Sequence, residues 1–314
     1  IVAASDVYKR QNLTNKYQNA SEIPLMISMD AEWGVGMRLD SVPKFPWNMS
    51  LGAIKNDLLI EKIGSEIGYQ FKRLGIHMNF APVIDINTNP KNPIIGNRSY
   101  GENKINVSEK GISFTKGIQS NNVLATAKHF PGHGDTSKDS HLTLPTINFD
   151  EKRIKKVELY PFKKLIEDGL SAVMIAHLNV PSLEKENMLP STLSKNIIEK
   201  TLIKELNFNG LIITDALEMK GVSEFTKKNV DLMAFLAGND ILLMSSDISK
   251  GIKSIKKSIK KGKISEQRLA RSVKKILKAK YKVGLNNYKS IETSNLIDDP
   301  VSYTHLTLPT IREV

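Results

Sequence analysis

Short apolar runs alternate with longer amphipathic stretches along most of the chain. Six runs have the length and flanking polar or breaker residues typical of buried strands, at 23–30, 74–86, 123–130, 171–178, 210–217 and 240–244. Between them, apolar residues recur at helical spacing, clearly so at 57–75, 150–169 and 194–208. Because parallel strands need long crossover connections, this alternation predicts an α/β fold with a parallel sheet.

Polar groups occupy a consistent place in this pattern, at the carboxyl ends of the predicted strands. They are Asp30, Asp85, the pair Lys128 and His129, His177, and Asp215. Such placement favours a (β/α)8 TIM-type barrel, in which the βα loops build one active site. An open doubly wound sheet is the alternative, but it would gather polar groups at one switch point. Six strands instead of eight predict a barrel that is incomplete at the N-terminus.

The two ends of the chain differ in character from the rest. The heptapeptide HLTLPTI occurs at 141–147 and again at 305–311, which is too short for a structural repeat. The segments 1–11 and 301–314 resemble translated sequencing-adapter sequence, and we expect both to be non-native tails. Residues 12–285 are then the partial barrel domain, and 286–300 a linker to an absent C-terminal region.

Composition narrows the classes of function. The chain of 314 residues has 40% hydrophobic and 25% charged residues, no cysteine and a formal net charge of +12. The positive excess gathers at 249–282, where apolar residues keep helical spacing and lysines fill the other positions, as on a solvated helix surface. No RNA-binding motif or aromatic stacking platform is present, and no apolar run reaches a membrane span. We therefore expect neither a nucleic-acid partner nor a membrane span.

The segment KHFPGHGDTSKDSHLTLP, at 128–145, concentrates proton-active groups on one loop. His129 and His133 are four residues apart, as in a helical zinc motif, but the Pro-Gly pair between them prevents a helix. A loop metal site stays as an alternative, built from His133, Asp135, Asp139 and His141. The interpretation that we prefer has no metal. Asp139 orients His141, which then donates and accepts a proton near neutral pH.

A second carboxylate stands out at the end of an apolar strand, in ITDALEM at 213–219. By itself, Asp215 could be a nucleophile, a ligand or the cap of the following helix. The residues alone leave these three roles open.

Three segments together resemble the family 3 glycoside hydrolases, within them the N-acetyl-β-glucosaminidase branch. They are KHFPGHGDTSKDSH, NFAPVIDINTNPKNPIIGNRSYG at 79–101, and ITDALEM, and the resemblance extends over about 23–285. It implies a barrel and a retaining mechanism. It also implies that Asp215 is the nucleophile and that His141, paired with Asp139, is the acid/base.

The same resemblance implies a sugar-binding pocket. Lys128, His129 and Arg98 match positions that bind the sugar at the −1 subsite. Asp30 matches the aspartate that holds the distal hydroxyls, and Arg38 lies in the same motif. The chain departs from the family pattern after Asp30, in DAEWGVGMRL at 30–39, where Trp33 replaces a glycine.

These observations predict a retaining β-N-acetylhexosaminidase that acts on peptidoglycan-derived muropeptides or chitin-like oligosaccharides and needs no cofactor. The alternatives are a β-glucosidase or a glycoside phosphorylase on the same barrel, and a non-catalytic carbohydrate-binding barrel. The bacterial compartment, whether periplasmic, secreted or cytoplasmic, and the oligomeric state stay open at this point.

Overall fold

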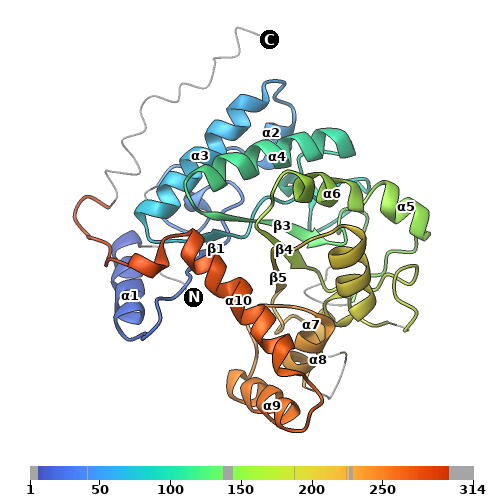
Figure 1. Cartoon of the computed structure of the whole chain (residues 1–314). Coiled ribbons are helices and arrows are strands. Elements are labelled where there is room, and N and C mark those ends of the chain that lie inside the picture. Colours follow the sequence, from blue (N-terminus) through green and yellow to red (C-terminus); the bar gives the residue numbers. More distant parts are fainter. Residues whose placement is uncertain are drawn as a thin grey trace.

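The computed structural model describes residues 6–40, 42–136, 144–186, 188–223, 225 and 229–296. In this part of the chain, five parallel strands form one curled sheet in the order β1-β2-β3-β4-β5 (Figure 1). The strands are β1 Ser28–Met29, β2 Met78–Asn79, β3 Leu124–Phe130, β4 Ala172–Ile175 and β5 Leu211–Thr214. Parallel strands that follow one another in chain order are the arrangement of a β/α barrel, so the predicted fold class is confirmed.

Helices fill the connections between these strands. The α-helices are α1 Val7–Asn19, α2 Asn48–Gly52, α3 Asp57–Arg73, α4 Lys104–Ser120, α5 Glu151–Lys156, α6 Leu159–Glu167, α7 Lys220–Ser223, α8 Val230–Ala237, α9 Ile248–Lys260 and α10 Glu266–Lys282. The shorter or irregular elements are the 3-10 helices η1 Val35–Met37, η2 Gly96–Arg98, η3 Ser191–Leu193 and η5 Leu285–Asn287, and the π-helix η4 Asn196–Glu205.

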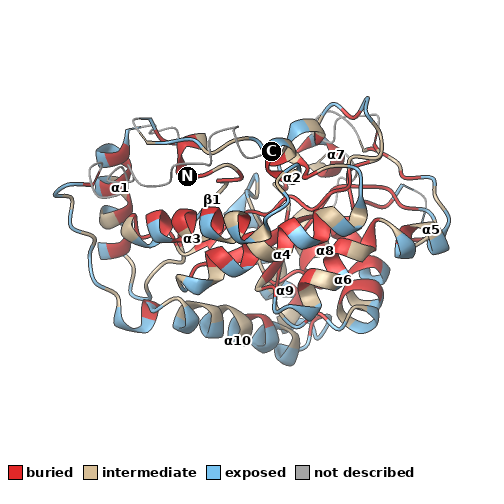
Figure 2. Ribbon diagram, turned by 90° about the horizontal axis from the view of Figure 1, so that it is seen from above, coloured by how far each residue is buried: buried red, intermediate tan, exposed pale blue. Residues whose placement is uncertain are grey.

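The two faces of the sheet are buried by different helices, as the alternation of side chains along a strand requires. In β4, Val173 and Ile175 belong to the large core that includes apolar residues of α3, α4 and α6. Ala172 and Met174 point to the other face, where α10 packs with side chains such as Ile276. Figure 2 shows that buried and exposed residues alternate along α3 and α4. The strands, buried on both faces, therefore lie in the interior of the domain.

Helices α3 and α4 approach closely because glycines lie at their contact. A β-carbon added to Gly117 would lie 2.1 Å from the backbone oxygen of Glu61, and one added to Gly64 would lie 2.4 Å from that of Phe114. No side chain fits at such distances. The glycines thus set how closely α3 and α4 approach each other.

Several predicted elements differ from the structure. The strand expected at 74–86 pairs only at Met78–Asn79, with one further bridge at Val83, and the helix expected at 194–208 is the π-helix η4. Two of the differences have a local cause. The helix expected at 150–169 is divided into α5 and α6, because Pro161 has no amide hydrogen and its ring excludes the carbonyl that would lie four residues before it. The strand expected at 23–30 pairs only at Ser28–Met29. Before it, the backbone of Leu25 is hydrogen-bonded in both directions by the side chain of Gln18 in α1.

The sixth predicted strand, at 240–244, lies beside β5 as expected but makes a single parallel bridge between Ile213 and Ile241. Lys275 of α10 reaches into this region, where its ammonium group lies 3.0 Å from Oδ2 of the buried Asp240. This ion pair attaches α10 to the last strand position of the described sheet.

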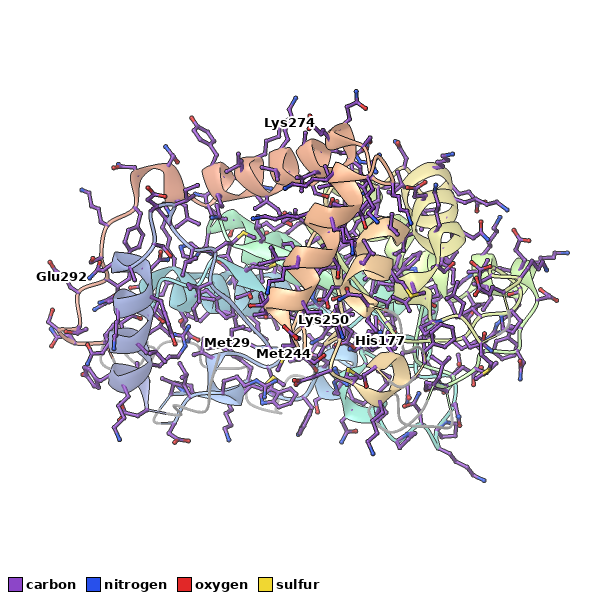
Figure 3. The ribbon with its side chains drawn as sticks, turned by 90° about the horizontal axis from the view of Figure 1, so that it is seen from below. Met29, His177, Met244, Lys250, Lys274 and Glu292 are labelled. Carbon is purple, nitrogen blue, oxygen red and sulfur yellow. The ribbon has the colours of Figure 1, made fainter. Side chains whose placement is uncertain are left out.

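The first and last described segments lie next to each other. Asn15 of α1 donates to the carbonyl oxygen of Ile291 at 2.9 Å, and Arg73 of α3 donates to the carbonyl oxygens of Glu292 and Ser294. Figure 3 shows Glu292 at the edge of the molecule beside α1. The domain boundaries predicted at 11, 285 and 300 stay predictions. Among the described residues, no helix combines the length and apolar character needed to cross a membrane.

Candidate active site

The carboxyl ends of the five strands bring ionisable side chains to one edge of the sheet. Asp30 follows β1, Asp85 follows β2, Lys128 lies within β3, His177 follows β4 and Asp215 follows β5. In a parallel sheet these ends all face the same way. The residues selected from the sequence pattern therefore lie at one common edge.

Lys128 is the centre of the cluster after β1. Its side chain is 3% exposed, and its ammonium nitrogen lies 2.7 Å from Oδ1 of Asp30 and 2.8 Å from Oε1 of Glu32. Burial alone would lower the pKa of Lys128, but the two carboxylates raise it above its ordinary value. Arg38 donates to the other oxygen of Asp30 at 3.1 Å and is half-exposed. Lys128 is therefore a fixed cation, and the Asp30–Arg38 pair forms the exposed rim beside it.

Glu32 is shared between two cations. Arg98 binds it through both Nε and an Nη nitrogen, at 2.9 and 2.8 Å, which is the bidentate geometry of a strong arginine–carboxylate pair. Burial alone would raise the pKa of Glu32, but Lys128 and Arg98 together hold it far below its ordinary value. The ionised Glu32 therefore fixes the positions of both cations.

Asp85 organises the end of β3. The backbone amide of His129 lies 3.2 Å from both carboxylate oxygens, the ring Nδ1 of His129 lies 2.6 Å from Oδ2, and the amide of His133 donates to Oδ1 at 2.6 Å. The His129 Nε2 lies 3.3 Å from Arg98, which can only donate, so Nε2 accepts and Nδ1–H donates to Asp85. Burial would raise the pKa of Asp85, but His129 and His133 hold it below its ordinary value.

Asp215 and His177 form the other side of the cluster. The Asp215 Oδ1 accepts from the amide of Ala216 at 2.8 Å, and the amide of Asp215 donates to the carbonyl of Ile175 in β4. His177, which is fully buried, donates from Nε2 to the carbonyl of Ala216 at 2.9 Å, while its Nδ1 lies 2.6 Å from Oγ1 of Thr192. Burial would raise the pKa of Asp215, but His177 and His129 lower it. Asp215 is thus an ionised carboxylate held at the edge of the sheet.

The loop after β3 is attached to the cluster at both of its described ends. On the first side, Asn92 donates to the carbonyl of His133 at 2.8 Å, and Asn89 to that of Thr136 at 3.2 Å. A β-carbon added to Gly134 would lie 1.8 Å from the carbonyl oxygen of Ile86, so only glycine fits there. On the second side, the amide of Asn179 donates to the carbonyl of Pro145 at 2.9 Å.

Asp139 and His141, which lie between these two attachments in sequence, fall outside the described residues. Their predicted roles therefore stay predictions, as does the metal alternative, which shares them. Within the described ranges, no group of three or more His, Asp and Glu side chains is arranged to hold a metal ion.

The sequence predicted the cations of the site and one of their carboxylate partners, Asp30, but not Glu32. The predicted Asp30, Arg38, Arg98, Lys128 and His129 all belong to one network. Asp85 and His177 were placed at the strand ends without a role, and Glu32 was not selected. Asp85 and His177 carried a usable signal, since each ends an apolar strand. Glu32 lies two residues beyond Asp30, in a turn whose direction the sequence pattern does not show.

A curled parallel sheet with an ionised carboxylate and paired cations at its strand ends defines an enzyme domain of the β/α-barrel class. The chain belongs to glycosyl hydrolase family 3, since residues 2–279 match the family's N-terminal domain. The family suggested by the sequence motifs is thereby confirmed.

Individual relatives agree with this assignment. The chain is 35% identical over 302 residues to "Beta-hexosaminidase A" of Pseudoalteromonas piscicida, covering 87% of this chain and 50% of that protein. A family 3 β-N-acetylglucosaminidase from Paenibacillus sp. str. FPU-7 has 37% identity and a TM-score of 0.87, covering 94% of this chain and 60% of that one. The structure of "Beta-glucoside phosphorylase BglX" has 26% identity and a TM-score of 0.88, covering 94% and 56%. The chain spans only part of the length of each relative.

Proposed function

We propose that this chain carries the barrel of a retaining β-N-acetylhexosaminidase, which removes terminal N-acetylglucosamine from peptidoglycan-derived or chitin-like glycans. The observation that carries the proposal is the ionised Asp215 facing a cluster whose own charges balance. The cluster has three carboxylates and three cations, namely Asp30, Glu32, Asp85, Arg38, Arg98 and Lys128. A balanced cluster suits an uncharged sugar, and the remaining carboxylate suits the positive charge that develops at an anomeric carbon.

In the first step, Oδ2 of Asp215 attacks the anomeric carbon while the bond from that carbon to the leaving oxygen breaks. The leaving oxygen takes a proton from the imidazolium of His141, which Asp139 orients. In the second step, neutral His141 takes a proton from water, and the water oxygen displaces the Asp215 carboxylate. Meanwhile, Asp30, Arg38, Arg98, Lys128 and His129 hold the hydroxyl groups of the sugar.

The described ends of the loop support a role for His141 at this site. The loop leaves the cluster next to His133, whose amide binds Asp85, and returns at Pro145, which is bonded to Asn179 beyond the end of β4. Both attachments lie at the strand edge that carries Asp215. Residues 137–143 connect these two attachments in the sequence, and His141 is one of them.

The preference for an N-acetylglucosaminide is supported by the names of the hexosaminidase relatives and by the resemblance of the loop sequence. The test compares 4-nitrophenyl N-acetyl-β-glucosaminide with 4-nitrophenyl β-glucoside, each with and without inorganic phosphate. We expect the N-acetylglucosaminide to have the higher kcat/KM in either buffer. A faster reaction in phosphate that yields a sugar 1-phosphate would instead favour a phosphorylase, and equal rates on both glycosides would contradict the specificity.

The role of Asp215 is tested separately by substitution. We expect Asp215→Ala to abolish turnover, because no other group takes its place as nucleophile, and to prevent covalent labelling by a slow 2-fluoro or 5-fluoro glycosyl donor. Peptide mapping of the labelled wild-type protein should locate the sugar on Asp215. Label on Asp85 or Glu218 would overturn the assignment.

A further inference from the structure

Both tryptophans of the chain lie together on the rim of the candidate active site. Trp33 and Trp47 are the only two in the sequence, and their ring centroids are 4.2 Å apart with an interplanar angle of 47°. Trp47 is 46% exposed, and Trp33 is partly exposed. Two large aromatic rings that face solvent together are unusual, because tryptophan is highly buried on average.

The pair is attached to the site from both sides. Glu32, which precedes Trp33, binds Arg98 and Lys128, while Asn48, which follows Trp47, donates to the carbonyl oxygen of Arg98 at 2.8 Å. The two loops are joined to each other, since the amide of Phe45 donates to the carbonyl of Trp33 at 3.1 Å. The rings therefore have a fixed position relative to Arg98, and movement of either loop would disturb the site.

The surroundings of the rings indicate the chemistry of what they bind. Asp30 and Arg38 lie three and five residues from Trp33 in the chain and pair with each other, and their side chains remain 34% and 50% exposed to solvent. An aromatic face next to such polar groups matches a sugar ring, which presents an apolar C–H face and hydroxyl groups at its edge. A protein partner would need a far larger surface than two rings provide.

We propose that Trp33 and Trp47 form a carbohydrate-stacking subsite at the rim after β1, which deepens the proposed function and rests on it. Neither tryptophan has a part in breaking or forming a bond in the proposed mechanism. A contact that acts equally on the bound ground state and the transition state changes KM and leaves kcat almost unchanged, and we expect this of the two rings.

Intrinsic fluorescence provides a direct test, because every tryptophan of the chain belongs to this pair. Titration of di-N-acetylchitobiose into the Asp215→Asn variant, which prevents turnover, should give a saturable change in tryptophan emission. In the wild-type background, Trp47→Ala should raise KM about threefold to tenfold, with kcat changed less than about twofold. Trp47→Phe should keep most of the affinity, because a phenyl ring still offers a stacking face.

Tyr69→Ala is the matched control, since Tyr69 is also 46% exposed and lies on α3. It should change neither KM nor the emission response. Unchanged tryptophan emission at saturating disaccharide, or an unchanged KM in Trp47→Ala, would overturn the subsite. If the wild type still hydrolyses the N-acetylglucosaminide, the proposed function stands. Saturable emission without hydrolysis of either nitrophenyl glycoside would support the subsite and overturn the function. Circular dichroism of each variant establishes that it is folded.

Discussion

At the scale of single residues, the site depends on charges that are buried and mutually neutralised. Burying an ion costs several kcal/mol in real proteins, and only a well-placed partner offsets that cost. Lys128 and Glu32 have side chains that are 3% and 1% exposed, so neither can recover water contacts if the other is removed. The Lys128–Glu32 pair therefore fixes the positions of its two side chains more than it adds to the free energy of unfolding.

We predict that Glu32→Gln destabilises the fold as well as the site. The change leaves Arg98 without its carboxylate partner and Lys128 with Asp30 alone, and an uncompensated buried charge typically costs about 3–5 kcal/mol. Urea unfolding followed by circular dichroism measures the loss. Glu102→Gln, at an exposed position, is the control and should change stability by less than about 0.5 kcal/mol. A loss no larger than that of the control would mean that solvent reaches these cations.

For His141, we expect the loss of rate on substitution to depend on the leaving group of the substrate. His141→Ala should slow aryl glycosides with poor leaving groups far more than those with activated ones, because only the former need protonation. Asp139→Ala should give a weaker form of the same pattern. Initial rates over a series of substituted phenyl N-acetylglucosaminides measure how steeply the rate depends on the leaving group. An equal loss for every leaving group would contradict an acid role.

The sequence predicts single residues of the site better than it predicts their pairing. Asp85, Lys128 and Asp215 could be located because each interrupts an apolar run at a strand end. The Glu32–Arg98 contact could not, because it joins positions 66 residues apart in the chain. Such contacts depend on how two loops turn after their strands, and periodicity contains no information about that direction.

At the scale of elements, the same contrast recurs. Strand and helix positions followed from periodicity, whereas their lengths depended on local chemistry. Pro161 divided the predicted helix at 150–169, and the side chain of Gln18 replaced strand partners for Leu25. The bases of β1 and β2 show a further case, in which a histidine side chain completes the pairing. The Nδ1 of His77 accepts from the amide of Ile27 at 3.1 Å.

This contact predicts that mild acid weakens the edge of the sheet. Burial, with a smaller contribution from Lys280, lowers the pKa of His77 to about 4, against about 6.5 in an unfolded chain. Between these values the unfolded state binds more protons, so stability present above pH 6.5 is lost as the pH falls toward 4. Burial also lowers the pKa of His133 to about 4, which adds in the same direction.

The measurement is the urea midpoint at pH 7.5 and at pH 5. His77→Asn keeps an acceptor for Ile27 but has no titrating group, so its midpoint should fall less between the two pH values than that of the wild type. If both proteins lose the same amount, His77 does not contribute to the acid sensitivity. Each protein is compared with itself at the two pH values, so any effect of the substitution that does not depend on pH cancels.

At the scale of the whole molecule, charge and packing are unevenly distributed. Much of the positive excess lies on α9 and α10, where side chains such as Lys274 point outward (Figure 3). This agrees with the solvated helix surface predicted from the sequence. Ile276 and Ala279 of α10 pack against the second face of the sheet instead. The strand-end cluster, by contrast, balances its own charges, so the net charge of the chain is a property of its surface and not of the site.

The packing of 285–296 leads to the last prediction. Leu296 is fully buried in the main core, and the backbone of Ile291 and Glu292 accepts hydrogen bonds from α1 and α3. We predict that Leu296→Ala destabilises the chain by about 2–5 kcal/mol, the usual cost of removing a buried leucine side chain. Leu58→Ala, at a position 64% exposed, is the matched control and should change stability by less than about 0.5 kcal/mol.

If urea unfolding gives the same small change for both, the segment is detached in solution and behaves as the linker expected at 286–300. If only Leu296→Ala is destabilised, the first and last parts of the domain close against each other, and the sheet edge that carries Asp30 depends on that closure through α1.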